Sequence, residues 1–177
     1  MGRLYSLDLI KARGDNPLSR EYSVPKRQVP ARVALPGQAP AEVSLFLNEC
    51  AATHEGRERP SDLLNGSLPF IPALNPAGEV VLLHRDNLMF VTVAAGDESE
   101  DDRLQDGTEV SIDATVTMIR VVLEGGATVR GTVTYVMPKS QRRLQDYLNT
   151  DQQFLALRED DVVHLVNKRR VSLVSIE

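Results

Sequence analysis

The chain has 177 residues, of which 42% are hydrophobic and 25% are charged, and its formal net charge is −5 at pH 7. This composition is close to the average of globular proteins and excludes a collagen-like, a wholly disordered or a membrane protein. The start of the chain has no long apolar run of the signal-peptide kind. A single cysteine, Cys50, cannot form an internal disulfide, so we expect a cytoplasmic protein.

Charge and proline content divide the chain into four segments. Residues 1–30 carry six basic and three acidic side chains and three prolines, which predicts an extended basic arm. Residues 94–109 carry one basic and seven acidic side chains. Like charges repel one another in a compact form, so this run predicts an acidic linker, and it lacks the glycine and ligand spacing of an EF-hand calcium loop. The segments 31–93 and 110–177 remain, each long enough for one small domain.

Blocks of sequence in 31–93 recur in the same order in 110–177. Four collinear blocks are improbable by chance, so we expect a duplicated domain. The matched pairs are 32–37 with 120–125, 61–65 with 145–149, 70–74 with 154–157, and 79–81 with 161–163, and the last continues to 89–91 with 171–173.

In the first copy the clearest expected element is a short helix. Pro60 is tolerated in a first helical turn, and Asn65-Gly66 supplies residues that accept the conformation which ends a helix. Its second-copy counterpart is a helix near Ser140, in which Leu144 and Leu148 lie on one face.

The second copy shows the strand pattern best. Apolar residues alternate over 110–123 and change phase near its end, which predicts a long strand with a bulge or bend. The range 129–135 predicts the returning strand, and Gly131 within it indicates sharp curvature or a close backbone approach. Three short strands are expected at 154–157, 162–166 and 171–176.

A meander of five short, bent strands is most simply closed on itself, because closure removes the unpaired edges. The expected fold is therefore mainly β, with two tandem small β-barrels at 31–93 and 110–177. Each barrel is expected to carry the short helix between its second and third strands.

Two motifs of the second copy resemble the Sm-like barrel, in particular that of bacterial Hfq. They are the hairpin Val121-x-Leu123-x-Gly125, continued by Val129-x-Gly131, and the ending over 166–174. The resemblance implies an Sm-like or SH3-like barrel in each copy.

The likeness to Hfq is partial. That family ends with a Tyr-Lys-His turn entering an Ile-Ser strand, and this chain keeps Lys168 and Ser172 but has Asn167 and Arg169 at the flanking places. The aromatic-Asp pair with which that family positions a base is absent. The Asp-x-Leu-Asn pattern followed by Phe-Leu-x-Leu is instead similar to a family of small uncharacterised bacterial domains.

Residue types that carry chemistry are few. Cys50 and His54 are four residues apart, a spacing that suits a thiol and a base on a helix, but they lie where the copies differ in length. His84 and His164 do not correspond when the copies are matched, so they are not a duplicated ligand pair. We expect no catalytic site, no metal site and no cofactor.

Asp62 and Asp146 recur at the same place in the two copies. Two carboxylates brought together would suit acid-base chemistry. The favoured interpretation is that each one accepts hydrogen bonds from loop amides and holds the inserted helix on its barrel.

The candidate anion-binding or partner-binding residues belong to the second copy, and the corresponding places of the first copy are nearly neutral. The alternative is a solvated face that offsets nearby acids or docks the acidic linker. The candidates are Arg142, Arg143, Lys168, Arg169 and Arg170.

Two function classes follow. The first is a non-enzymatic interaction or scaffold module that binds a protein partner or itself, without a membrane. The alternative is an RNA-binding regulator of the Sm or Hfq type, which the net charge of −5 disfavours because basic side chains supply most of the affinity for phosphates.

Overall fold

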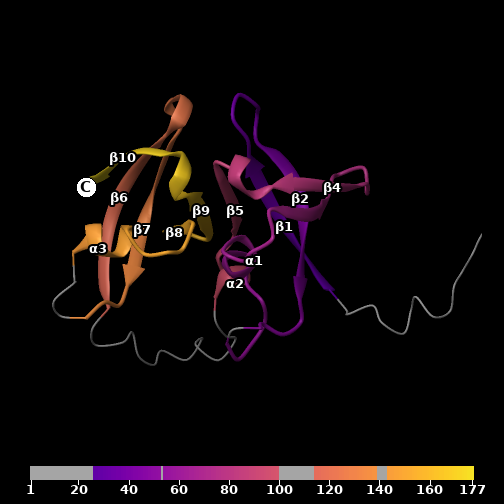
Figure 1. The fold of residues 1–177 in the computed structure, drawn as a ribbon, viewed down its shortest axis with the longest axis horizontal. Helices are drawn as coiled ribbons and strands as arrows, with labels where there is room; N and C mark the ends of the chain where they lie inside the picture. The colour runs from indigo at the N-terminus through magenta and orange to yellow at the C-terminus, as the bar shows by residue number, and fades with distance from the viewer. Residues whose placement is uncertain (1–25, 53, 100–113, 139–142) are drawn as a thin grey trace, which may run out of the picture.

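The computed structural model describes residues 26–52, 54–99, 114–138 and 143–177 (Figure 1). Most of the expected arm, the centre of the expected acidic linker and the candidate residue Arg142 lie outside these ranges. We refer to residues 26–99 as the first half and to residues 114–177 as the second half.

The first half contains five strands, and a five-residue helix lies between the second and the third. Its elements are β1 (Lys26–Ala34), β2 (Ala41–Asn48), α1 (Pro60–Leu64), β3 (Phe70–Leu74), β4 (Val80–His84), a 3-10 turn (Arg85–Asn87), β5 (Phe90–Ala94) and α2 (Ala95–Glu98).

The second half repeats the five strands, the helix after the second strand and the 3-10 turn before the fifth strand. Its elements are β6 (Thr115–Leu123), a turn (Glu124–Gly126), β7 (Thr128–Tyr135), α3 (Leu144–Leu148), β8 (Phe154–Glu159), β9 (Val162–Asn167), a 3-10 turn (Lys168–Arg170) and β10 (Val171–Ile176). The mainly β class is therefore confirmed, and each half carries its helix between its second and third strands.

All ten strands belong to one antiparallel sheet with the order β10-β6-β7-β8-β9-β5-β1-β2-β3-β4. Each half has the same internal order, because its fifth strand pairs with its first (β5 with β1, β10 with β6). The halves meet where β5 pairs with β9, from Phe90 opposite Val166 to Ala94 opposite Val162. We call this pairing the junction, and it lies at the centre of Figure 1.

The sheet is open, so the two closed barrels expected from the sequence are not what the structure shows. The fourth strand of the second half, β9, pairs with β5 of the first half instead of with its own fifth strand. β4 and β10 are left at the two ends of the sheet. Because the domain is duplicated, the edges of β5 and β9 cover each other, and neither half has to close on itself.

The same strand registers occur in both halves, with one correction to the sequence match. Ala31 lies opposite Val43 in the first half, as Ile119 lies opposite Gly131 in the second. Phe70 lies opposite His84, whereas its counterpart Phe154 lies opposite Asn167. The matches of 79–81 and 89–91 are therefore wrong by one residue, because the turn before β9 is one residue shorter than the turn before β4, not two.

Two expected boundaries also differ from the structure. β1 begins at Lys26, within the expected arm, and Pro30 lies inside it. The strand tolerates this proline because β1 pairs with β5 only from Ala31 onward, so at Pro30 β1 pairs with β2 alone. At the other boundary, α2 lies within the expected linker and packs on α1 and β5.

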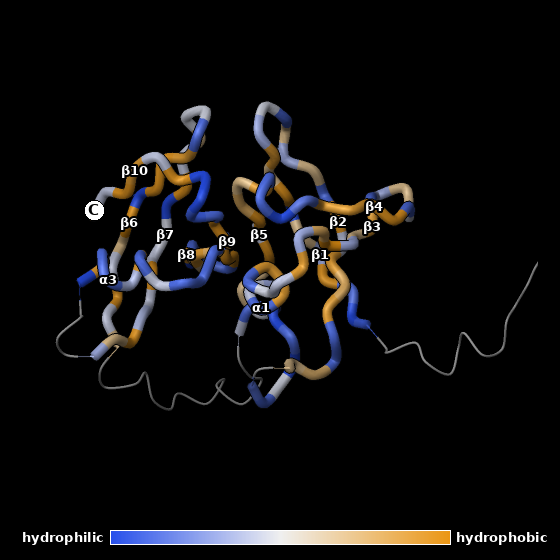
Figure 2. The backbone as a smooth tube through the Cα atoms, in the orientation of Figure 1, coloured by the Kyte–Doolittle hydropathy of each residue, from blue (hydrophilic) through white to orange (hydrophobic). Residues whose placement is uncertain are grey.

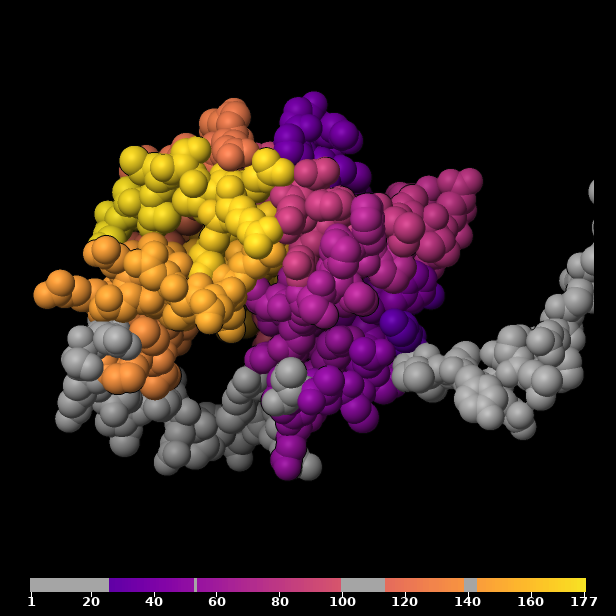
Figure 3. All heavy atoms as spheres, in the orientation of Figure 1, coloured from indigo at the N-terminus to yellow at the C-terminus, as the bar shows by residue number. Residues whose placement is uncertain are grey.

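The apolar residues form two clusters that exchange side chains across the junction. The first-half core includes Phe154, Val163 and Leu165 from the second half. The second-half core includes Ala34 and Met89 from the first half. Figure 2 shows the hydrophobic segments along the strands of both halves, and Figure 3 shows the halves in contact along a seam.

Gly131 lies where the backbones of β7 and β8 approach closely, as its place within a strand predicted. A Cβ at this position would lie 2.9 Å from the Arg158 carbonyl oxygen and 3.1 Å from the Leu157 Cβ. The corresponding pair in the first half is Val43 and Ala73, so the small and the large side chain have exchanged places between the halves.

Candidate functional sites

The predicted basic residues Lys168, Arg169 and Arg170 form the turn between β9 and β10. The Lys168 Nζ donates to the carbonyl oxygens of Leu148 at 3.0 Å and Thr150 at 2.6 Å. Burial lowers the pKa of Lys168. This lysine therefore holds the end of α3 against the turn.

The two arginines of this turn bind the first half. The Arg169 guanidinium donates to the Asp86 carboxylate at 2.8 Å. Arg170 donates to the Asp86 carbonyl oxygen at 2.9 Å, to the Asn87 side chain at 3.1 Å and to Glu124 at 3.0 Å. The basic turn thus docks on the corresponding turn of the first half.

Arg143 lies elsewhere, at the N-terminal end of α3. Its backbone N–H donates to the Asp146 carboxylate at 3.3 Å, as the Arg59 N–H donates to Asp62 at 2.9 Å in α1. Both aspartates therefore accept hydrogen bonds from backbone amides, as the favoured interpretation predicted, and each one stays with its own helix.

Asn167 and Asn65 join the halves through side-chain amides that sequence reasoning did not identify. Asn167 is fully buried and donates to the Leu88 carbonyl oxygen at 2.8 Å. Asn65 brackets Phe154, accepting from its N–H at 2.8 Å and donating to its carbonyl oxygen at 3.3 Å. Asn65 recurs in the second copy as Asn149, but this recurrence predicted only the end of a helix and not a contact between the halves.

A polar pocket of about 570 Å³ opens between the halves beside these contacts. Its lining includes Asn65, Arg85, Gln153, Lys168 and Arg169. The Arg85 Nε is buried and has no hydrogen-bond partner within the described residues. Two of the predicted candidates thus line a pocket, together with an arginine of the first half that was not predicted.

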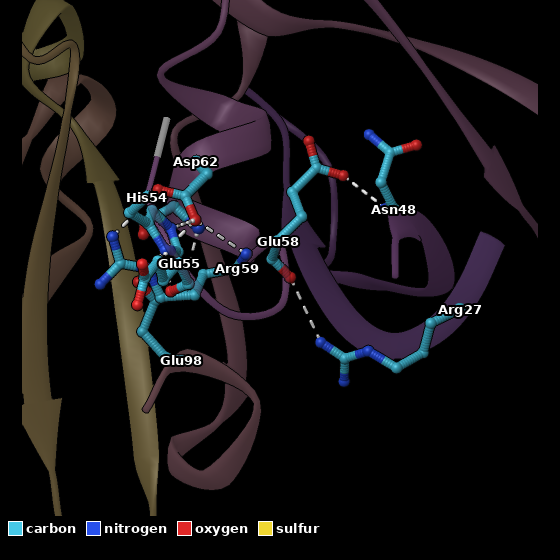
Figure 4. Close-up of polar contacts among 9 residues, drawn as sticks. Arg27, Asn48, His54, Glu55, Glu58, Arg59, Asp62 and Glu98 are labelled. Carbon is cyan, nitrogen blue, oxygen red and sulfur yellow. Dashed lines mark hydrogen bonds and ion pairs between the residues drawn. The ribbon is translucent and has the colours of Figure 1, made fainter. Parts of the chain in front are cut away.

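A second polar cluster surrounds the start of α1 (Figure 4). The His54 Nε2 lies 2.8 Å from the Asp62 carboxylate, and its Nδ1 lies 2.9 Å from the Glu55 carbonyl oxygen. Arg59 donates to the same carboxylate through Nε at 3.1 Å and through Nη2 at 3.0 Å. Both ring nitrogens of His54 are therefore engaged by acceptors, and neither is left to take a proton from the Cys50 thiol.

These contacts shift the pKa values of both partners. Burial raises the pKa of Asp62, but the hydrogen bonds from Arg59 and His54 outweigh it and hold the value at about 2. The hydrogen bond to the Glu55 carbonyl, followed by the one to Asp62, raises the pKa of His54 above 6.5. The cluster is a capped helix start whose histidine keeps its proton to a higher pH than a free histidine does.

We therefore expect an NMR titration to place the pKa of His54 above 6.5. Asp62→Asn is expected to lower it, because the charged acceptor is lost, whereas Asp146→Asn at the same place in α3 leaves it unchanged. Linkage makes the bond stabilise the fold below pH 6.5, and the contribution falls as the pH rises through the higher folded pKa. The assignment is contradicted if the His54 pKa lies at or below its ordinary value, or if Asp62→Asn leaves this pKa unchanged.

Over the described ranges, no three His, Cys, Asp or Glu side chains lie close enough to hold a metal ion. Within the same part of the chain, no helix is both long and apolar enough to cross a bilayer.

Comparisons of the chain with protein-family models, with curated proteins and with solved structures find no match.

Proposed function

We propose that this chain is a non-enzymatic interaction module, built from two Sm-like halves that share one open sheet, and that it binds polypeptide through the edges of this sheet. The Sm-like part of the proposal is supported by the motifs in the second copy and by the strand order that both halves share. We also propose that the chain works in the cytoplasm, because the free thiol of Cys50 suits a reducing compartment.

The observation that carries the proposal is the state of the two end strands. β4 and β10 each pair on one side only. Val80 and Leu82 on β4, and Leu173 and Ile176 on β10, are large apolar side chains exposed to solvent. Proteins usually protect such edges with charges, prolines or bulges, because an unpaired edge accepts another strand. An added strand would gain main-chain hydrogen bonds and cover these side chains.

The test compares three immobilised forms of the full chain in a lysate of the source cells. They are the wild type, the edge variant Leu82→Lys/Ile176→Lys, and the control Val136→Lys, which changes an exposed apolar residue outside both edges. We expect defined polypeptides, identified by quantitative mass spectrometry, on the wild type and the control and not on the edge variant. The same polypeptides on all three forms contradict edge binding.

RNA binding of the Sm type is the second candidate, and one observation favours it. The pocket between the halves presents Arg85, whose Nε has no partner among the described residues, beside Lys168 and Arg169. A short single-stranded RNA is expected to bind there with an affinity that falls with salt and is weakened by Arg85→Ala. Arg85 suits this test because Lys168 also holds the end of α3 and Arg169 also binds Asp86 of the first half. The absence of binding at low salt removes this candidate.

A further inference from the structure

We infer that the cleft between α2 and the second half binds a small zwitterion of the amino-acid class, with its ammonium group at Glu98 and its carboxylate at Arg158. We call this space the α2 cleft. The inference goes beyond the proposed function, because the lining of the cleft belongs to α2, α3, β7, β8 and β9 and to neither edge strand.

The α2 cleft forms where α2 docks on the second half. The Ala95 N–H donates to the Asp161 carbonyl oxygen at 2.8 Å, and α2 packs against β9 near the centre of the molecule (Figure 1). A cleft of about 230 Å³ remains between α2 and the neighbouring elements of the second half. Sites for drug-sized ligands begin at about 300 Å³, so the α2 cleft suits a smaller molecule.

The wall formed by α2 carries a carboxylate. Glu98 lies at the end of α2, where its carboxylate accepts a hydrogen bond from the Ser61 N–H at 3.1 Å. Burial raises the pKa of Glu98, and the charges of Arg59 and Asp62 act on it in opposite directions. No ion pair engages Glu98 within the described residues. A cation bound in the cleft would therefore stabilise the charged form of this carboxylate.

The wall formed by the second half carries a guanidinium group. Arg158 lies on β8 opposite Thr132 of β7, and its side chain is exposed. Among the residues that the structure describes, nothing forms a hydrogen bond or an ion pair with this side chain. Glu98 and Arg158 thus line one cleft without pairing with each other. An arginine in this state can bind a carboxylate through two parallel hydrogen bonds.

Hydroxyl groups and a small apolar surface complete the α2 cleft. The hydroxyls of Thr134 and Tyr147 have no hydrogen-bond partner in the described part of the chain. The Tyr147 ring is stacked on Tyr135 with 4.8 Å between ring centres, and burial raises the pKa of Tyr147. Ala156 and Val163 supply apolar surface. The cleft therefore offers polar groups at fixed places beside room for a short aliphatic side chain.

These groups discriminate between small ligands by charge. A ligand with only a positive charge leaves Arg158 without a partner, and a ligand with only a negative charge meets the Glu98 carboxylate. A zwitterion satisfies both groups. The apolar surface disfavours a charged side chain, which would lose its hydration there. L-valine combines the two charges with a short aliphatic side chain and is the probe for the test.

The experiment is an NMR titration of the full chain with three probes. They are L-valine, L-valinamide, which lacks the carboxylate, and isovalerate, which lacks the ammonium group. We expect saturable binding of L-valine, with the largest shifts at residues of the α2 cleft, and at least tenfold weaker binding of the other two probes. The inference is overturned if L-valine does not bind saturably, or if all three probes bind equally.

Two variants assign the charges. Glu98→Gln keeps an oxygen that can accept from the Ser61 N–H, and it is expected to lose the preference for L-valine over isovalerate. Arg158→Gln is expected to lose the preference for L-valine over L-valinamide. The matched controls are Glu79→Gln and Arg130→Gln, which change exposed residues outside the α2 cleft and are expected to keep both preferences.

A third variant keeps the inference testable if Glu98→Gln does not fold. Tyr147→Phe removes only the hydroxyl and retains the ring on Tyr135, so it is expected to fold and to bind L-valine several-fold more weakly. Folded variants of Glu98 and Arg158 that keep both preferences overturn the inference. None of these results affects the proposed function, because the lysate test depends on β4 and β10.

Discussion

Phe154→Ala is expected to lower the free energy of unfolding by about 3–5 kcal/mol, the range for removing a buried phenylalanine side chain. Phe154 belongs to the second half, but its ring lies in the first-half core and is 1% exposed. Asn65 fixes its backbone on both sides, so the surrounding residues have little freedom to fill the cavity. Removal of the Phe154 ring is expected to weaken the junction as well as the first-half core.

The matched control for this prediction is Phe70→Ala. Phe70 occupies the same place in β3 but is half exposed, with its ring edge-on to His84 at 4.8 Å. We expect it to cost about 1 kcal/mol or less. Both changes are made in the Leu82→Lys background, so that no edge pairing adds to the measured stability. Equal losses in urea unfolding at the two positions contradict the assignment of Phe154 to the junction.

Gly131→Val is expected to cost about 1–3 kcal/mol, the usual penalty for overpacking a full core. The added Cβ lies 2.9 Å from the Arg158 carbonyl oxygen and 3.1 Å from the Leu157 Cβ, so β7 and β8 must move apart. The first half avoids this conflict with Val43 against the smaller Ala73, both of which are buried.

The first half also shows how to relieve the strain. Leu157→Ala alone is expected to cost about 2–5 kcal/mol by leaving a cavity. In the double variant Gly131→Val/Leu157→Ala, the valine side chain occupies part of that cavity, as Val43 does beside Ala73. The double variant is therefore expected to be at least about 1 kcal/mol more stable than the sum of the single losses predicts. Strictly additive losses contradict the exchange of volume between the two halves.

The duplication and its elements were predictable because they depend on local patterns. The helix ends at Asn65 and Asn149, the aspartates at Asp62 and Asp146, and the close approach at Gly131 all follow from residue types at fixed spacings. Each of these contacts lies within one half, at short range or across neighbouring strands.

The junction was not predictable from the same patterns. Isolated copies suggested closure, because closure removes both unpaired edges of a single small sheet. The actual partner of β9 is β5, and no local signal distinguishes these two pairings. The one-residue error in the last matched blocks has a similar cause, since the length of the turn before β9 becomes clear only from the strand register.

The turn at Lys168–Arg170 was predicted, but its contacts with the first half were not. Composition showed three positive charges in sequence at Lys168–Arg170 and a nearly neutral turn at Arg85–Asn87. It did not show that these two turns contact each other, since Asp86 and Arg169 are far apart in the chain. The segment charges show that the two turns have diverged, but they do not show that the turns bind each other.

The most direct measurement is a disulfide across the junction within one chain. Thr92→Cys and His164→Cys are introduced together into a Cys50→Ser chain, which is oxidised under mild conditions. Because Thr92 lies opposite His164 where β5 pairs with β9, the two thiols should lie within the distance that a disulfide spans. The expected result is a disulfide within this chain and far less in the out-of-register chain with Phe90→Cys and His164→Cys. Equal disulfide formation in both chains, or none in either, would show that β5 and β9 do not pair in this register.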